Sequence, residues 1–190
     1  MSLVNVSPMI IGLAGPMRSG KSVVAARLAD LYGFEREPFS KPLKAMLRAF
    51  GLTEEQLEGE LKNTPSALLG GKTPRYAMQT LGTEWGRSLI HPKLWLSHWA
   101  WRAVEHTING LSVVEEGTRF PNEVEVIKSL GGFVVFVERP AEQRGVSSEH
   151  VSEMGNMQEL ADFTLYNGGS FDDLYENIDV MMCQLGKRHG

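Results

Sequence analysis

The side chains that could do chemistry in this sequence begin with Lys21 and Ser22, which follow Gly15 and Gly20 in the pattern G-x-x-x-x-G-K-[ST]. The two glycines permit backbone conformations that a Cβ would obstruct, so successive N–H groups can point at one polyphosphate. Lys21 adds a positive charge at the β- and γ-phosphates, and the Ser22 hydroxyl can ligate Mg²⁺. The pattern predicts a phosphate-binding loop (P-loop) that holds ATP and Mg²⁺. The residues expected to bind the nucleotide are Gly15, Arg18, Ser19, Gly20, Lys21, Ser22 and Val23.

Basic side chains near strand ends form two further groups. The side chains expected to bind one monophosphate are Lys44, Arg75, Arg87 and Arg119. Arg139 and Arg144 are expected to close over the transferring phosphoryl group. A nucleotide loop with a second phosphate pocket is a two-substrate layout, which indicates a kinase rather than a motor or a switch. The predicted catalytic residues are Lys21, Arg119, Arg139 and Arg144.

Two carboxylates, Glu115 and Glu116, end the predicted third strand, where a parallel α/β sheet places its active groups. Neighbouring residues of a strand point to opposite faces, so one of the two can reach the shell of the metal ion. Glu116 is nearer the carboxyl end of the strand. The predicted Mg²⁺ ligands are therefore Ser22 and Glu116.

Composition limits the partners and the compartment of the protein. With 190 residues the chain can bury one substantial core and is expected to form a single domain. A net charge of −4 and a pI near 5.8 do not indicate the excess of positive charge that binds a nucleic acid polymer. The expected anionic partner is therefore a small molecule. Cys183 is expected to be a small buried residue, and one cysteine suits a reducing cytosol. Without a signal peptide or a membrane span, the protein is expected to be soluble and cytoplasmic.

Hydrophobic patterning predicts five short strands separated by helices. Residues 8–14 are apolar on both faces, as a central parallel strand is, and the P-loop follows them directly. This order predicts an open, mostly parallel, three-layer α/β fold, with ligands at the carboxyl ends of the strands. The strands are expected at residues 8–14, 34–39, 112–116, 133–137 and 162–167.

Apolar side chains spaced by three and four predict the helices. A helix from Thr73 is expected to break at Gly82 and Thr83, and residues 59–72 are expected to be a surface excursion. Residues 140–161 are polar and are expected to form a lid. The apolar faces are expected to contain Val24, Leu28 and Leu31 in the first helix, Leu43, Met46, Leu47 and Phe50 in the second, and Leu174, Ile178, Met181 and Leu185 in the last.

Segments in order along most of the chain resemble those of the phage-type deoxynucleoside monophosphate kinases. The P-loop is shared by many families, whereas residues 79–87 and 119–123 together are much more specific. The matching segments are residues 12–22, 39–44, 75 with 79–87, 119–123, 150–153 and 167–170. One departure concerns the metal site, because Gly117 occupies the position where the family usually has an Asp. Glu115 or Glu116 must then replace that carboxylate, or the contact is absent.

The resemblance implies transfer of the γ-phosphoryl group of ATP to a deoxynucleoside 5′-monophosphate. It implies one P-loop nucleotide kinase domain over residues 1–190, with a monophosphate-binding insertion at about 40–110 and an arginine-bearing lid at about 140–161. His150 is expected either to form a hydrogen bond of the lid or to be a plain surface histidine, and not to be a general base. The implied substrate-binding residues are Phe39, Ser40, Lys44, Arg75, Gln79, Thr83, Arg87, Trp95, Arg119 and Glu123.

Other interpretations stay open at this point. A P-loop kinase with a hydroxyl acceptor, such as a dephospho-coenzyme A kinase, would share Lys21 and the arginines and could use Glu116 as a base. A nucleotide-binding protein without turnover would also keep the P-loop. Four tryptophans, Trp95 among them, could bury the interface of a homodimer.

Overall fold

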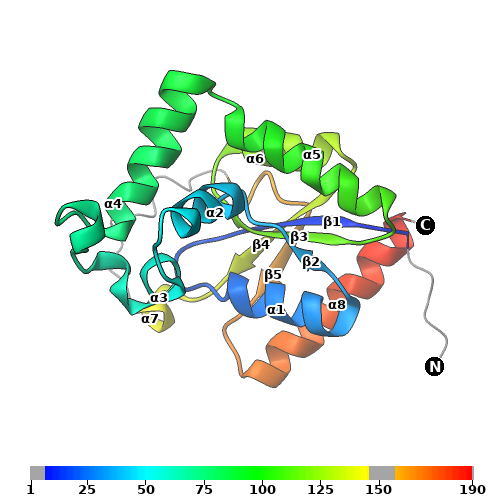
Figure 1. Cartoon of the computed structure of the whole chain (residues 1–190). Helices are drawn as coiled ribbons and strands as arrows, with labels where there is room; N and C mark the ends of the chain where they lie inside the picture. The colour runs from blue at the N-terminus through cyan, green and yellow to red at the C-terminus, as the bar shows by residue number, and fades with distance from the viewer. Residues whose placement is uncertain (1–6, 146–156, 190) are drawn as a thin grey trace. The chain divides into compact units, whose positions relative to one another are not determined.

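The chain forms a five-stranded sheet in the order β2-β3-β1-β4-β5, and every pair of neighbouring strands is parallel (Figure 1). The structure is a computed structural model that describes residues 7–145 and 157–189. The predicted sheet is confirmed, although β2 covers only two of the six residues expected for it and β3 ends two residues later than expected. The strands are β1 (Ile10–Ala14), β2 (Glu35–Arg36), β3 (Val113–Thr118), β4 (Phe133–Glu138) and β5 (Phe163–Tyr166).

Helices cover both faces of this sheet, which confirms the predicted three layers. On one face lie α1 (Lys21–Tyr32) and α8 (Phe171–His189), and on the other lie α6 (Pro121–Ser129) and the second half of α5 (Leu94–Ile108) (Figure 1). Ile11 and Leu13 of β1 are fully buried in the core beneath α1 and α8. Gly12 lies between them on the strand and faces the opposite side of the sheet. It leaves space for Ile127, since a Cβ on Gly12 would lie 2.3 Å from the Ile127 Cδ1 atom. β1 is thus enclosed on both faces, which explains its continuous apolar sequence.

Local signals in the sequence fix several helix ends. Gly33 adopts φ 70° and ends α1, as a glycine after a helix does. The Thr53 N–H donates to Gln56 Oε1 at 3.0 Å in a capping box, and the Ser170 hydroxyl accepts from the Asp173 N–H at 3.2 Å at the start of α8. Each of these helix ends follows from residue types that are typical of that position.

Some side chains predicted to be buried are exposed. Leu31 is 55 % exposed, because Phe34, which the turn at Gly33 folds back, occupies the core beside Leu28. Cys183 is exposed, since two positions after Met181 on a helix lie on nearly the opposite side. Met46 and Phe50 of the second helix are also exposed, and only Leu43 and Leu47 of its predicted face are buried.

The chain divides into two compact units. One unit joins the residues up to Pro38 with those from Ala100 on, and the other is Phe39–Trp99. The second unit has its own core of Leu43, Leu47, Leu52, Leu57 and Trp95. Its elements are α2 (Lys41–Ala49), α3 (Glu54–Leu57), the 3₁₀ turns η1 (Glu60–Asn63) and η2 (Ala67–Leu69), α4 (Pro74–Gln79) and η3 (Thr80–Ile90).

The predicted break at Gly82 and Thr83 is wrong, because the helix continues as the π-helix η3. In this wider helix, hydrogen bonds join residues five apart, as in the bond from the His91 N–H to the Gly86 carbonyl oxygen at 3.0 Å. Trp95 occupies the space at the two glycines. Its indole N–H donates to the Gly82 carbonyl oxygen at 2.8 Å, and a Cβ on Gly86 would lie 2.6 Å from its ring. The glycines here admit an indole rather than end a helix.

The segment predicted to be a lid begins with the short helix α7 (Ala141–Arg144), which ends at Gly145. His150 and the rest of residues 146–156 lie outside the described residues. Within residues 7–145 and 157–189, no helix is both long and apolar enough to cross a membrane.

Candidate active site

The P-loop joins the end of β1 to the start of α1, and its path depends on glycine at two positions. Gly15 has φ 137°, and a Cβ there would lie 2.4 Å from the Val137 carbonyl oxygen of β4. Gly20 has φ 102°, and a Cβ there would lie 2.3 Å from the Asn167 side-chain nitrogen. Residues that have a side chain rarely adopt either backbone conformation. The loop can therefore lie directly against β4 and the residues after β5, with the N-terminus of α1 at its end.

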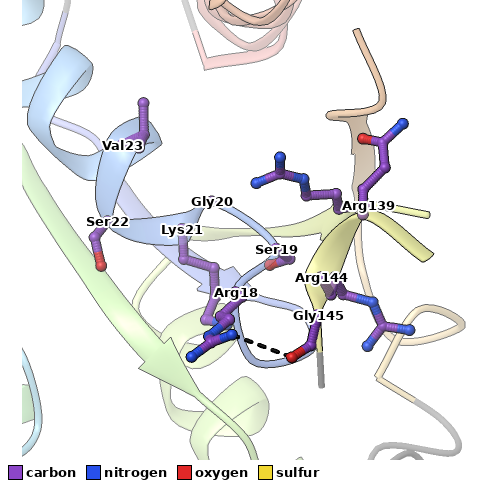
Figure 2. Close-up of a pocket in the computed structure, with 10 residues that line it drawn as sticks. Arg18, Ser19, Gly20, Lys21, Ser22, Val23, Arg139, Arg144 and Gly145 are labelled. Carbon is purple, nitrogen blue, oxygen red and sulfur yellow. Dashed lines mark hydrogen bonds between the residues drawn. The ribbon is translucent and has the colours of Figure 1, made fainter. Parts of the chain in front are cut away.

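A cavity of about 600 Å³ lies at this loop (Figure 2). Residues 18–23 line one side, and Arg139, Gln143, Arg144 and Gly145 line the other. A hydrogen bond from Arg18 to the Gly145 carbonyl oxygen, 3.2 Å long and drawn as a dashed line, joins the two sides. The fold thus brings the predicted nucleotide residues from Arg18 to Val23 together with both predicted lid arginines.

Lys21, the first residue of α1, is the most strongly perturbed cation of this cavity. Its ammonium donates to the carbonyl oxygens of Gly15 at 2.7 Å and Pro16 at 2.8 Å. The pKa of Lys21 is lowered from 10.5 to about 8, mainly by burial and also by the Arg119 guanidinium, whereas Glu115 and Glu116 act in the opposite direction. Keeping Lys21 charged therefore costs free energy in the free protein, and a bound polyanion would offset that cost.

The two carboxylates predicted to end the third strand lie in the middle of β3, and they have different surroundings. Glu115 is 1 % exposed, and its two oxygens accept from the Gly117 N–H at 2.8 Å and from the Thr118 hydroxyl. Glu116 forms an ion pair with Arg36 through Oε1 at 2.5 Å. Its Oε2 atom is buried and has no hydrogen-bond partner among the described residues. An unpaired buried oxygen next to a lysine is a candidate ligand for a cation or its water.

The three predicted catalytic arginines are held in different ways, and Arg139 and Arg144 line the cavity whereas Arg119 is not among its lining residues. Arg119 is exposed, and its N–H donates to the Glu123 carboxylate at 2.7 Å, so Glu123, which is 4 % exposed, fixes the backbone at the start of α6. The Nε atoms of Arg139 and Arg144 are buried, and neither has a hydrogen-bond partner in the part of the chain that the structure describes. Both donors could be satisfied by a ligand in the cavity.

The remaining predicted substrate residues lie in the unit Phe39–Trp99. Arg75 Nε donates to Asn63 Oδ1 at 2.6 Å, and Lys44 Nζ lies 2.5 Å from Glu58 Oε1. Trp95 is buried in the core of this unit. Phe39 is buried with its ring centroid 4.7 Å from that of Trp99, and Ser40 precedes α2.

Four of these residues form a row at spacings of four, from α4 into η3. Its members are Arg75, Gln79, Thr83 and Arg87. Four residues make slightly more than one full turn of an α-helix. In the wider π-helix η3, four residues make slightly less than one full turn. The opposite drifts offset each other, so the change from α- to π-helix keeps the four residues on one side of the helix. Arg75, Gln79 and Thr83 are all exposed.

Comparison with known proteins assigns this arrangement to a family. The sequence model of the family described as "Deoxynucleotide monophosphate kinase" matches residues 72–178. The chain is also 32% identical over 186 residues to a protein of Acanthamoeba polyphaga mimivirus that is named after deoxynucleotide monophosphate kinases, covering 90% of this chain and 94% of that protein. The chain belongs to the deoxynucleotide monophosphate kinase family.

Two further comparisons support the placement of this kinase. It is 34% identical over 89 residues to the deoxynucleoside-5′-monophosphate kinase of Escherichia phage T5, which covers 44% of this chain and 34% of that protein. Among solved structures, shikimate kinase from Aquifex aeolicus vf5 has a TM-score of 0.54 at 16% identity, covering 95% of this chain and 98% of that one. At that identity the likeness concerns the fold alone, and it confirms the predicted P-loop kinase fold.

Sequence reasoning missed several residues of this kinase's cavity. Gln143 and Gly145 line it, and Asn167, which follows β5, contacts the P-loop. Asn167 lies in a segment that carries the resemblance, but its residue type alone did not suggest a role. Its position directly after a strand was the available signal, since parallel strands end at the ligand edge of the sheet.

We expect the free energy of unfolding to report the lowered pKa of Lys21. Because that pKa falls from 10.5 to about 8 on folding, the unfolded state binds more protons between these pH values. The unfolding free energy of the wild type relative to Lys21→Met should therefore rise as pH increases through this window. Urea denaturation of both proteins over that range measures the difference. A flat or falling difference would contradict the account of Lys21.

Proposed function

We propose that this protein transfers the γ-phosphoryl group of ATP to a deoxynucleoside 5′-monophosphate, giving ADP and a deoxynucleoside diphosphate. The observation that carries the proposal is one cavity in which the P-loop with Lys21 faces Arg139 and Arg144, in a chain of the deoxynucleotide monophosphate kinase family. ATP is the proposed donor, since a P-loop binds the polyphosphate of a nucleotide.

The donor phosphates are proposed to bind at residues 15–23. Backbone N–H groups and the start of α1 would hold the phosphate oxygens, and Lys21 would leave the Gly15 and Pro16 carbonyls to meet the β- and γ-phosphates. An oxygen of the acceptor phosphate attacks the γ-phosphorus, and the bond to the bridging oxygen breaks as ADP leaves with its electrons. The acceptor is already an anion, so no general base is required. Arg119, Arg139 and Arg144 would stabilise the charge of the transferring group.

Ser22 and Glu116 are the residues proposed to hold Mg²⁺. Ser22 is exposed at the first turn of α1, and Glu116 has a buried oxygen without a hydrogen-bond partner among the described residues, so both fit a cation with oxygen ligands. When bound, Mg²⁺ neutralises charge on the β- and γ-phosphate oxygens. Glu115 fits less well, because both of its oxygens accept hydrogen bonds from β3.

The acceptor monophosphate is proposed to bind to residues of the unit Phe39–Trp99, and Arg119 and Glu123 of the other unit stay predicted substrate residues. The row of polar side chains on α4 and η3 supports this, because it combines two guanidinium groups with an amide and a hydroxyl, and three of its four residues are exposed. Planar guanidinium groups bind a phosphate by paired hydrogen bonds. The proposed acceptor residues of this unit are Phe39, Ser40, Lys44, Arg75, Gln79, Thr83, Arg87 and Trp95.

The single domain, the lid over about residues 140–161, the homodimer and the cytoplasmic location stay predictions. Of the four tryptophans, Trp95 and Trp99 are buried, whereas Trp85 is 37% exposed and Trp101 is 61% exposed. An interface that uses tryptophan would therefore involve Trp101 before Trp95.

We expect ADP release in a coupled assay to require both ATP and a deoxynucleoside monophosphate. Lys21→Met should fold and lower turnover by a factor of about 100 or more, because it removes a pre-placed charge at the phosphates. Lys187→Met, the same change at an exposed lysine of α8, should keep wild-type turnover. ADP release with a hydroxyl acceptor, or ATP binding without any release, would contradict the proposal and support one of the two alternatives.

Replacing the acceptor arginines should separate the two substrates. Arg75→Ala and Arg87→Ala are each expected to raise the KM for the monophosphate at least about tenfold and to leave the KM for ATP nearly unchanged. Arg48→Ala is the matched control, since Arg48 is an exposed arginine of the same unit that pairs with Glu54. Equal increases for both substrates would show that the two phosphate sites are assigned wrongly.

The proposed Mg²⁺ site predicts different effects for substitutions of the two neighbouring glutamates. Glu116→Gln is expected to raise the Mg²⁺ concentration that gives half-maximal turnover and to lower kcat, because a neutral amide is a weaker ligand. Glu115→Gln keeps a group that can hydrogen bond within β3 and should change Mg²⁺ dependence much less. Steady-state rates over a Mg²⁺ titration test this. A larger effect of Glu115→Gln than of Glu116→Gln would assign the metal to Glu115. If neither variant changes the Mg²⁺ dependence, the metal would be held by Ser22, phosphates and water alone.

A further inference from the structure

The loop after β5 reaches across to the P-loop through one side chain. Asn167, the first residue after β5, donates from Nδ2 to the Ser19 carbonyl oxygen at 2.7 Å. Asn167 is 8 % exposed, and its own N–H donates to the Glu138 carbonyl oxygen at 2.7 Å, which fixes its backbone on β4. The side chain is therefore held at both ends before any ligand arrives.

This contact fixes the direction of one peptide group. In a trans peptide the C=O and the following N–H point in opposite directions. Because Asn167 holds the Ser19 carbonyl on its own side, the Gly20 N–H points away from Asn167. Ser19, Gly20 and Lys21 all line the cavity. The orientation of this peptide thus decides whether an N–H or a C=O is presented to a phosphate.

Two details indicate that this approach is specific. A Cβ on Gly20 would lie 2.3 Å from Asn167 Nδ2, so glycine at this position of the motif admits the amide as well as the turn. The Ser19 hydroxyl is fully buried and has no hydrogen-bond partner among the described residues. Ser19 is thus held through its carbonyl while its hydroxyl is left for a further partner, which an anion in the cavity can supply.

We propose that Asn167 is a positioning residue for the donor phosphates, because it orients the Ser19–Gly20 peptide of the P-loop. This inference rests on the proposed function, in that the anion it serves is the polyphosphate of the donor. Asn167 acts through the P-loop backbone and is not proposed to touch the phosphates. An aspartate there could not donate to the Ser19 carbonyl and would place a negative charge beside the site, and a leucine would leave the carbonyl unpaired.

The test measures binding of inorganic tripolyphosphate by calorimetry, which needs neither a base nor turnover. Asn167→Leu is expected to raise the Kd about tenfold and Asn167→Asp to raise it more, whereas Asn167→Ser, which can donate through a water, should lie between wild type and leucine. Asn177→Leu is the matched control, because Asn177 Nδ2 donates to the Tyr166 carbonyl oxygen at 3.2 Å without contacting the P-loop. Its Kd should equal that of the wild type.

Kinetics then separate positioning from a general structural role. In the coupled assay, Asn167→Leu should raise the KM for ATP and leave the KM for the monophosphate within about twofold. Wild-type binding of tripolyphosphate by folded Asn167→Leu and Asn167→Asp would overturn the inference, and so would equal effects on both substrates. If leucine does not fold, the serine and aspartate variants still decide. Failure of the proposed function differs, because wild type would then bind tripolyphosphate but release no ADP with any monophosphate.

Discussion

A loop that turns its N–H groups toward an anion must find partners for the carbonyl groups on its other side. In this protein that constraint governs the surroundings of the P-loop. In the free protein the Lys21 ammonium donates to the Gly15 and Pro16 carbonyl oxygens, and the Asn167 amide donates to that of Ser19. The order of the sheet bears on the last of these contacts, because β4 lies beside β1 and β5 beyond it, so that Asn167 after β5 can reach the P-loop.

The sequence predicted the sheet and the P-loop because their signals are local. Apolar runs between turn residues mark strands that are covered on both faces, and the spacing of Gly15, Gly20 and Lys21 specifies a backbone geometry directly. The sequence-based prediction was wrong where a side chain distant in the sequence determines the local backbone structure. Gly82 carries the signal of a helix end, and no local pattern shows that the indole of Trp95 will occupy the space and keep the helix going.

The candidate site shows the same division. Arginine and lysine side chains that follow strands are recognisable as phosphate ligands from their charge, and the cavity brings Arg139 and Arg144 to the P-loop. Gln143 and Asn167 carry no charge, and their positions depend on how β4, β5 and the P-loop meet. Residues that position others are harder to predict than residues that bind, because their chemistry is ordinary and only their placement is special.

The π-helix lets chain length change without changing the direction in which Arg87 points. A π-turn holds one residue more than the α-turn it replaces. Removing one residue between Gly82 and Gly86 would let one wide turn close into an α-turn, and the residues beyond it would keep their direction because either turn completes one rotation. A relative that lacks one residue in η3 would then still present Arg87 on the same side, whereas the same deletion within an α-helix would rotate it by about 100°.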